Sequence, residues 1–259
     1  MFLSFRKTSM MIALAMIAIC NPGTITARAE TAEAREKPRL YSYVAIWTIP
    51  RSDWAAMGES SPAARDLAAK SLASGKLLGI GEAFSLMHHH GGPTHINWWS
   101  SASEAGLLTY LDEESALPGN PVLTKSTNHA DYILVSTYYN RKSATVQNGY
   151  EMVSYLKLKD DAPEKSYSTI AKSVFAPILE KLFSEGVLVE YQICAEDFQS
   201  GPARGFWIES ISPTADGIDK LGAAWRDAME KSPTVEFSTG YLDWNAGRDY
   251  LYHVDATLK

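Results

Sequence analysis

The sequence has few cysteines, which excludes a disulfide-stabilised scaffold. Its 259 residues include only two, Cys20 and Cys194, and Cys20 lies in an apolar N-terminal segment. A single cysteine in the folded part cannot form an internal disulfide, so stability must come from an ordinary hydrophobic core. Cys194 lies in an alternating apolar and polar pattern without a nearby histidine. We therefore expect a buried, unreactive thiol.

Several catalytic motifs are also missing. The sequence contains no G-x-S-x-G elbow, no P-loop and no H-E-x-x-H zinc motif. Gly79-Ile80-Gly81 resembles the start of a dinucleotide-binding loop, but Phe84 stands where the third glycine belongs. Hydrolase and nucleotide-binding functions therefore lack support.

Residues 1–29 have the pattern of a secretory signal. Arg6 and Lys7 are followed by the apolar run Met10–Ile19 and by an A-x-A cleavage site at Ala27–Ala29. The apolar run is too short for a helix that spans a bilayer. We expect residues 1–29 to be removed and the protein to be periplasmic or secreted.

A lipid anchor on Cys20 is the alternative. Lipid-anchored cysteines normally follow a small residue, whereas Ile19 precedes Cys20. A cleaved signal is therefore favoured, and the polar residues 30–39 are expected to form a flexible leader.

Basic residues are scarce once the signal is gone. Loss of Arg6, Lys7 and Arg28 lowers the 24 basic residues of the whole chain to 21, against 30 acidic residues, and takes the net charge from −6 to −9. Nucleic acid and anionic membrane surfaces need a basic footprint, so neither is expected as a partner. No later apolar run is long enough for a membrane helix, so we expect no membrane association after signal cleavage.

The first half of the mature chain predicts the order β-α-β-β-α-β. The second helix of this half has a capping-box pattern, with Ser101 as the expected cap and Glu104 three residues later. Gly79 and Gly81, in the second strand, predict a bulge or a close backbone approach. The expected strands are Tyr41–Ile49, Leu77–Met87, Thr94–Ser100 and His129–Asn140, and the first helix is Ala63–Ser74.

The same order returns after a short polar connection, residues 141–148. We expect a helix over Glu164–Glu185, with a kink at Pro177 and an end at Gly186. A second helix opens at Pro213-Thr214. The expected strands are Tyr150–Lys159, Val187–Glu196, Arg204–Ile211 and Tyr250–Leu258.

A hairpin motif supports an internal duplication. The stretch His88–Trp99 holds four of the six histidines, and a fainter copy follows at Glu196–Trp207, with its glycine, proline and tryptophan 109 positions after those of the first. Both contain Gly-Pro-x4-Trp on the same predicted hairpin, which places Trp98 and Trp207 at matching positions. Trp98 is therefore expected to be a core residue.

Two β-α-β-β-α-β units in tandem resemble the dimeric α+β barrel superfamily. The helix end Phe175–Gly186, followed by a strand, is similar to its NIPSNAP-type and antibiotic-monooxygenase-type branches. The implied fold is α+β, with two tandem ferredoxin-like repeats forming an intrachain pseudo-dimeric barrel. The expected boundaries are repeat 1 over 40–142, a linker over 143–149 and repeat 2 over 150–259.

The resemblance leaves the activity open. Superfamily members include cofactor-free monooxygenases, haem-dependent chlorite dismutases, polyketide cyclases and proteins without known activity. No family catalytic motif matches residue by residue, so none is carried over. Haem members commonly place an axial histidine on a helix, and no predicted helix here contains a histidine, which counts against haem. No bound cofactor is expected.

Side-chain alternation in Val187–Cys194 predicts a polar group between the sheets. Val187, Val189, Tyr191 and Ile193 make a face suited to helices, so Leu188, Glu190, Gln192 and Cys194 point the other way. Glu190 is a candidate catalytic residue and Gln192 a candidate substrate-binding residue. The alternative is a buried hydrogen-bonding network without further function.

The third strand supplies the other candidates. Alternation sets His95, Asn97 and Trp99 opposite Ile96 and Trp98. His95 is a candidate catalytic residue, and Asn97 and Trp99 are candidate substrate-binding residues. His88 and His90 could join His95 to bind a divalent metal, although a solvated hairpin end that happens to be rich in histidine is the favoured explanation. His129 and His253 are expected to be structural.

Three functions follow as hypotheses. The first is a barrel that binds a small apolar or aromatic molecule, as a cofactor-free oxygenase, cyclase or isomerase. The second is a non-catalytic binding or interaction module whose inter-sheet space is filled by side chains. The third is a metal-binding protein that uses the His88–His95 hairpin. A monomer or a homo-oligomer would fit each of them.

Overall fold

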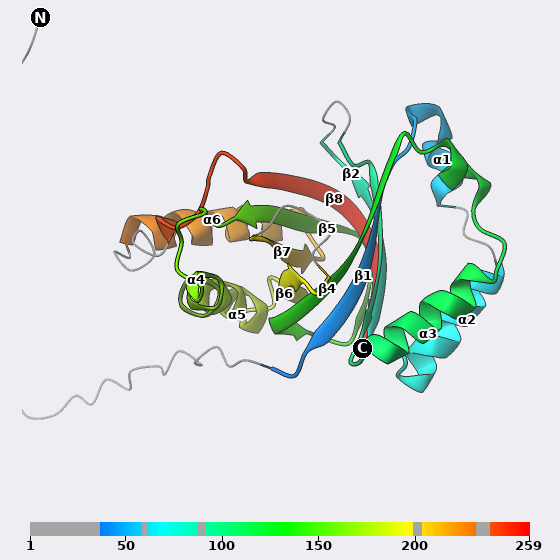
Figure 1. Cartoon of the computed structure of the whole chain (residues 1–259), viewed down its shortest axis with the longest axis horizontal. Coiled ribbons are helices and arrows are strands. Elements are labelled where there is room, and N and C mark those ends of the chain that lie inside the picture. Colours follow the sequence, from blue (N-terminus) through cyan, green and yellow to red (C-terminus); the bar gives the residue numbers. More distant parts are fainter. Residues whose placement is uncertain (1–36, 59–61, 88–91, 199–203, 232–238) are drawn as a thin grey trace, which may run out of the picture. The chain divides into compact units, whose positions relative to one another are not determined.

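Eight antiparallel strands close into a barrel (Figure 1). The computed structural model describes residues 37–58, 62–87, 92–198, 204–231 and 239–259. The strands are β1 (Leu40–Thr48), β2 (Gly79–Ser85), β3 (His95–Ser101), β4 (Asn128–Arg141), β5 (Ala144–Lys157), β6 (Glu190–Glu196), β7 (Gly205–Ser212) and β8 (Arg248–Leu258). The predicted signal segment, most of the predicted leader, His88, His90 and the Gly201-Pro202 turn lie outside the described residues.

The strand order around the barrel is β1-β3-β2-β8-β5-β7-β6-β4, and β4 pairs with β1 to close the ring. Strands of the first half therefore lie in the order β4-β1-β3-β2, and strands of the second half in the order β8-β5-β7-β6. The halves join where β2 pairs with β8 and where β4 pairs with β6.

Helices cover two opposite sides of the barrel (Figure 1). Helix α3 packs on β1 and β3, α5 on β4 and β6, and α6 on β5 and β7. None of the described helices is long and apolar enough to cross a membrane. The helical segments are η1 (Arg51–Asp53), α1 (Trp54–Met57), α2 (Pro62–Ser74), α3 (Glu104–Ser115), η2 (Pro121–Lys125), α4 (Ser166–Ile170), η3 (Ala171–Phe175), α5 (Ala176–Ser184) and α6 (Ala215–Lys231).

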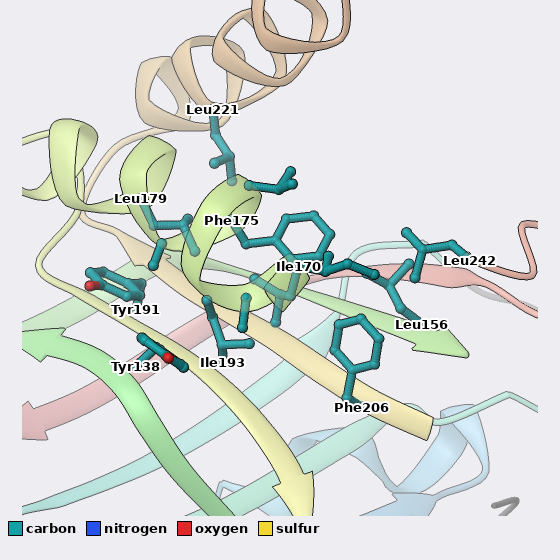
Figure 2. Close-up of a cluster of buried hydrophobic side chains, with 14 of the residues drawn as sticks. Tyr138, Leu156, Ile170, Phe175, Leu179, Tyr191, Ile193, Phe206, Leu221 and Leu242 are labelled. Carbon is teal, nitrogen blue, oxygen red and sulfur yellow. The ribbon is translucent and has the colours of Figure 1, made fainter. Parts of the chain in front are cut away.

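Three hydrophobic clusters follow from this arrangement. One fills the barrel and includes Trp98, Trp207 and Cys194. The second lies between the barrel and helices η3, α5 and α6, where Phe175 and Leu179 approach Ile193 from β6 (Figure 2). The third lies under α2 and α3. Because each strand alternates its side chains, one face feeds the interior cluster and the other a helix-facing cluster.

The long helix predicted over Glu164–Glu185 is interrupted as expected near Pro177. A π turn, η3, separates α4 from α5, and Pro177 lies in the first turn of α5. Proline has no N–H to donate and its ring collides with the carbonyl four residues earlier, so the regular α pattern cannot run through it. Gly186 ends the helix in the left-handed region, with φ of 77°.

Two details of the sequence prediction are wrong. The cap of α3 is Ser103, whose hydroxyl accepts a hydrogen bond from the Gly106 N–H at 3.0 Å, while the Ser101 hydroxyl donates to the Lys76 carbonyl. The second concerns the predicted connection before repeat 2. It is mostly strand, because β5 begins at Ala144 and pairs with β8 through a bulge between Val146 and Gly149.

Candidate functional site

The two faces of β3 have different surroundings. Trp98 pairs with Val44 and Ile96 with Ile46, and all four side chains belong to the cluster inside the barrel. His95, Asn97 and Trp99 therefore lie on the outer face.

The two candidate catalytic residues His95 and Glu190 do not share a site, because they lie on opposite faces of the barrel wall. Alternation defines two sets of side chains on β3 but does not tell which set faces inward. The packing of α3 on β3 settles the choice.

His95 is a buried, neutral histidine on the outer face. Its side chain is 4% exposed, its Nδ1 lies 2.9 Å from the Thr94 hydroxyl, and the Trp54 ring meets it edge-on at 5.3 Å. Burial lowers the pKa of His95 to about 4, because the imidazolium form is poorly solvated there. At neutral pH the ring is uncharged.

Asn97 joins His95 at a small outer cavity, whereas Trp99 does not. The cavity, of about 10 Å³, is also lined by Met57, Glu82 and Phe84. Burial raises the pKa of Glu82, and the neighbouring Asp255 raises it further. Trp99 instead packs between Tyr43 and Tyr110 at ring distances of 5.7 and 6.2 Å, so it belongs to the core under α3.

Ionisable side chains gather on the inner face of β4 to β7. Glu190 and Gln192 point inward, as the alternation predicts, and both are 2% exposed. Three further groups join them: Arg141 is opposite Glu190, Glu209 is opposite Gln192, and Glu151 is one strand further on. The barrel interior thus holds three carboxyl groups and one guanidinium.

Hydrogen bonds link part of this group. Arg141 and Glu190 form a buried ion pair through Nη2 and Oε1, and the Gln192 amide donates to the same carboxylate oxygen at 3.1 Å. The Gln192 carbonyl accepts from the hydroxyls of Ser136 and Ser42. The network ties β1, β4 and β6 together across one seam of the barrel.

The carboxyl groups are pushed toward their protonated forms. Burial raises the pKa of Glu209 to about 8, and the nearby Glu190 adds to the shift, while Arg141 opposes it. Burial also raises the pKa of Glu151 well above its usual value, with help from Glu209 and Glu190. The pKa of Glu190 is raised by burial, but Arg141 counteracts the shift. Glu190 is thus the carboxylate that has a cation partner.

Glu151 and Glu209 share the wall of a cavity inside the barrel. The cavity measures about 20 Å³, which is room for about one water molecule. Aromatic rings of Trp98, Tyr132 and Trp207 enclose it together with aliphatic side chains of β1, β3, β4 and β5. Two carboxyl groups in an enclosed, aromatic space can donate, accept or share a proton.

The two glycines of β2 make room for this group, as the sequence predicts. An added Cβ at Gly81 would overlap the Trp98 ring, and one at Gly79 would lie 2.8 Å from Arg141 Nη1. The Trp98 ring thus lies over Gly81, its pairing partner on the neighbouring strand, and Arg141 reaches from β4 to the bare backbone of β2. No larger residue at 79 or 81 fits without moving them.

Arg141, Glu151 and Glu209 were not among the predicted site residues. A signal existed for Glu209, which alternates with the inward-facing Trp207 and Ile211, and for Glu151, which alternates with Val153. Arg141 had none, because it falls at the end of a predicted strand.

The metal prediction is not tested, since His88 and His90 lie outside the described residues. Within the described ranges no group of three or more His, Cys, Asp or Glu side chains could hold a metal ion. His129 stacks on Trp47 at 3.5 Å, and His253 Nδ1 lies 3.3 Å from the Gly149 carbonyl, so both contact neighbouring strands.

Haem does not fit the barrel interior as the described residues fill it. The described histidines lie on β3, β4 and β8 rather than on a helix, and none of them is among the residues that line the interior cavity. A cavity of about 20 Å³ is far smaller than a porphyrin.

Comparison with known proteins shows a likeness in fold. No family model matches the sequence, and no curated protein matches it. A protein from Lactobacillus acidophilus NCFM, described as a candidate monooxygenase, matches with a TM-score of 0.56 and 10% identity over 86% of this chain and 97% of its own.

Two other solved structures match less well. An anthrone oxidase-like protein has a TM-score of 0.48 and 10% identity over 85% of this chain and 92% of its own. A mutant chlorite dismutase from Candidatus Nitrospira defluvii has a TM-score of 0.45 and 8% identity over 85% and 91%. The expected resemblance to the dimeric α+β barrel superfamily is confirmed for the fold, which does not by itself select a function.

Proposed function

We propose that this protein binds a small molecule with an apolar or aromatic body inside its barrel and transfers a proton to or from it. Glu209 is the proposed acid or base, and Glu151 its neighbour on the same cavity wall. The observation that carries the proposal is that these two carboxyl groups border one enclosed cavity with Trp98, Tyr132 and Trp207.

The chemistry suits a carboxyl group held in a dry space. A group with a pKa of about 8 exchanges its proton readily near neutral pH, whereas an exposed glutamate is almost always ionised there. Proton transfer of this kind is a step in cofactor-free isomerisation, cyclisation and oxygenation. The site therefore fits the expected class of reaction and requires no resident cofactor for the proton step.

A ligand must enter by moving side chains at one end of the barrel. Tyr132 and Tyr155 are only half-buried there, and each packs on Trp207 with ring centroids 5.4 and 5.2 Å apart. Rotation of these rings would enlarge the cavity toward solvent. The wall on the far side, where Arg141 meets Glu190, would stay in place.

A non-catalytic barrel is the second candidate, and the size of the cavity favours it. A space of about 20 Å³ is well below the several hundred Å³ of an ordinary ligand site. In this alternative the carboxyl groups only complete the core.

Ligand binding separates the two candidates. Indole and 2-naphthol are titrated into the protein while tryptophan fluorescence and the melting temperature are followed. The proposal expects saturable binding that Val153→Trp abolishes by filling the cavity, and an altered pH dependence of binding in Glu209→Gln. Glu114→Gln, which alters a half-buried acid on α3, outside the barrel interior, serves as the control. Absence of saturable binding would favour the non-catalytic barrel.

We also propose that the chain arose by internal duplication. The matching strand orders of the two halves and the inward positions of Trp98 and Trp207 on β3 and β7 support this.

Export to the periplasm or the medium is proposed from the N-terminal pattern. The intact mass of protein recovered from the periplasm of an expression host tests it, because cleavage after Ala29 leaves a chain that begins at Glu30.

A further inference from the structure

We infer that the ligand of the interior site carries a compact cation, a protonated primary amine, whose ammonium group lies between Glu151 and Glu209. This inference rests on the proposed function and adds the chemical class of the ligand. It follows from the charges, the unmet hydrogen-bonding capacity and the shape of the cavity.

Acidic groups outnumber basic groups among the described residues inside the barrel. Three carboxyl groups face one guanidinium, and Arg141 forms its ion pair with Glu190. Among the described residues, no ion pair reaches Glu151 or Glu209. The other titratable groups that face them from neighbouring strands are Cys194 and Tyr252, for both of which burial raises the pKa so that they stay neutral. A bound cation would supply the opposite charge that these two acids need in order to ionise inside the barrel.

Glu151 has an unused acceptor at the cavity. Its side chain is 2% exposed, and its Oε2 has no hydrogen-bond partner among the described residues. The Trp98 indole N–H is close enough to favour the ionised carboxylate, but it makes no well-formed hydrogen bond. A buried acceptor left unpaired is destabilising, and an ammonium donor at this point would satisfy it.

The remaining walls suit a cation. Trp98, Trp207 and Tyr132 present aromatic rings to the cavity, and ring faces attract ammonium groups, tryptophan most strongly. The space of about 20 Å³ fits one water-sized group, and an ammonium head is about that size. The organic body would then extend between Tyr132 and Trp207 toward the half-buried end of the barrel.

Negative charge near the half-buried end of the barrel also favours a cationic ligand. Burial raises the pKa of the Tyr132 and Tyr155 phenols, and the nearby Glu196 carboxylate raises both further. Together with the net charge of −6, this negative potential would draw cations toward the opening and repel carboxylate or phosphate ligands.

Binding of the amine must release protons. Burial raises the pKa of both Glu209 and Glu151, which favours their protonated forms, and each must ionise to pair with the ammonium group. The protons go to the buffer and no covalent bond changes. Affinity should therefore rise with pH until Glu209 is ionised, and fall again at higher pH as the amine itself loses its proton.

Matched ligands test the inference on the whole protein. Titration calorimetry compares 2-phenylethylamine with its neutral isostere 2-phenylethanol at pH 7, in phosphate and in MOPS, whose ionisation heats differ and neither of which is a primary amine. We expect the amine to bind about ten-fold more tightly and to release about one proton or more per ligand. Glu209→Gln and Glu151→Gln should each reduce the preference and the proton release, and Glu114→Gln should change neither.

The outcomes are distinguishable. Equal binding of the two ligands without proton release would overturn the cationic ligand and leave the proposed function standing. Failure of both ligands to bind would overturn both. Circular dichroism and thermal unfolding show whether each variant is folded, and because two single variants are used, a folding defect in one leaves the other as the test.

Discussion

The inner and outer faces of the barrel wall accommodate buried ionisable groups in opposite ways. On the outer face, His95 is a base that gives up its proton, with Thr94 as its polar partner. On the inner face, Glu151 and Glu209 are acids that keep theirs. Both faces thus avoid buried charge, and the exception is the Arg141–Glu190 pair, where two opposite charges are buried together. The comparison shows that neutralisation is the rule in this wall and pairing the special case.

The two faces should therefore respond to pH with opposite signs. Between about pH 4.5 and 8, Glu209 is protonated in the folded state but ionised in the unfolded chain. The free energy of unfolding therefore falls as pH rises through that window. Between about pH 6.5 and 4, His95 is neutral in the folded state but protonated in the unfolded chain. The free energy of unfolding therefore falls as pH falls through that window. The two windows overlap between about pH 4.5 and 6.5, where the opposite slopes largely cancel, so the combined contribution of these two groups to stability is greatest there.

The largest effect should come from breaking the buried ion pair. Arg141→Met leaves the Glu190 carboxylate without its cation in the interior, and we expect a loss of about 3–5 kcal/mol in urea unfolding at pH 7. The control is the double variant with Glu190→Met, which removes both charges and should recover most of the loss. If the single variant is as stable as wild type, Arg141 does not stabilise the buried Glu190 carboxylate.

Substitution at Gly81 should be the next largest. Gly81→Ala forces a methyl group against the Trp98 ring, and we expect about 2–3 kcal/mol of destabilisation. Gly119→Ala, where nothing lies within 4 Å of the added Cβ, is the matched control and should be close to neutral. Adding Trp98→Phe to Gly81→Ala should restore part of the stability. An unaffected Gly81→Ala would mean that the indole can move freely.

Glu209→Gln should flatten the alkaline side of the stability profile. Between pH 6 and pH 8, the free energy of unfolding of wild type should fall by about 2 kcal/mol more than that of the variant, because the glutamine side chain does not titrate. Urea midpoints measured at half-unit pH intervals check this. Parallel profiles for the two proteins would show that Glu209 titrates normally.

His95→Gln should flatten the acidic side by a smaller amount. Between pH 7 and pH 5, wild type should lose about 1.5 kcal/mol more than the variant, which keeps a polar side chain near Thr94 but cannot take up a proton. Titration of the His95 ring by NMR gives an independent value. A midpoint near 6.5 would contradict the described burial.

The strand pattern was readable from the sequence, but the inner face was readable only in part. Alternation predicted that Glu190 and Gln192 point inward, because the residues between and after them, Tyr191 and Ile193, form an apolar face that suits packing against helices. On β3 both sets contain aromatic residues, so Trp98 and Trp99 could be assigned to a face only once the packing of α3 was known.

Arg141 shows why the rest could not be predicted. In β4, Leu134 and Ser136 pair with inward residues of β6, and an irregularity between Ser136 and Tyr138 shifts the register by one. Without it, simple alternation would turn Arg141 outward. A bulge of this kind depends on pairing with β6, which lies far along the chain, so the local sequence around β4 does not predict it. The same holds for the space that Gly79 provides for the guanidinium.

Closure of the barrel also limits how this protein can be recognised. Each of the eight described strands already has a neighbour on both sides, so none presents a free edge to another chain. Recruitment of an extended peptide as an additional strand, and sheet-to-sheet assembly of copies through exposed edges, both need such an edge. Partners of the described part must instead contact side chains on the helices or at the open ends of the barrel. Recognition will then depend on surface chemistry, not on backbone pairing.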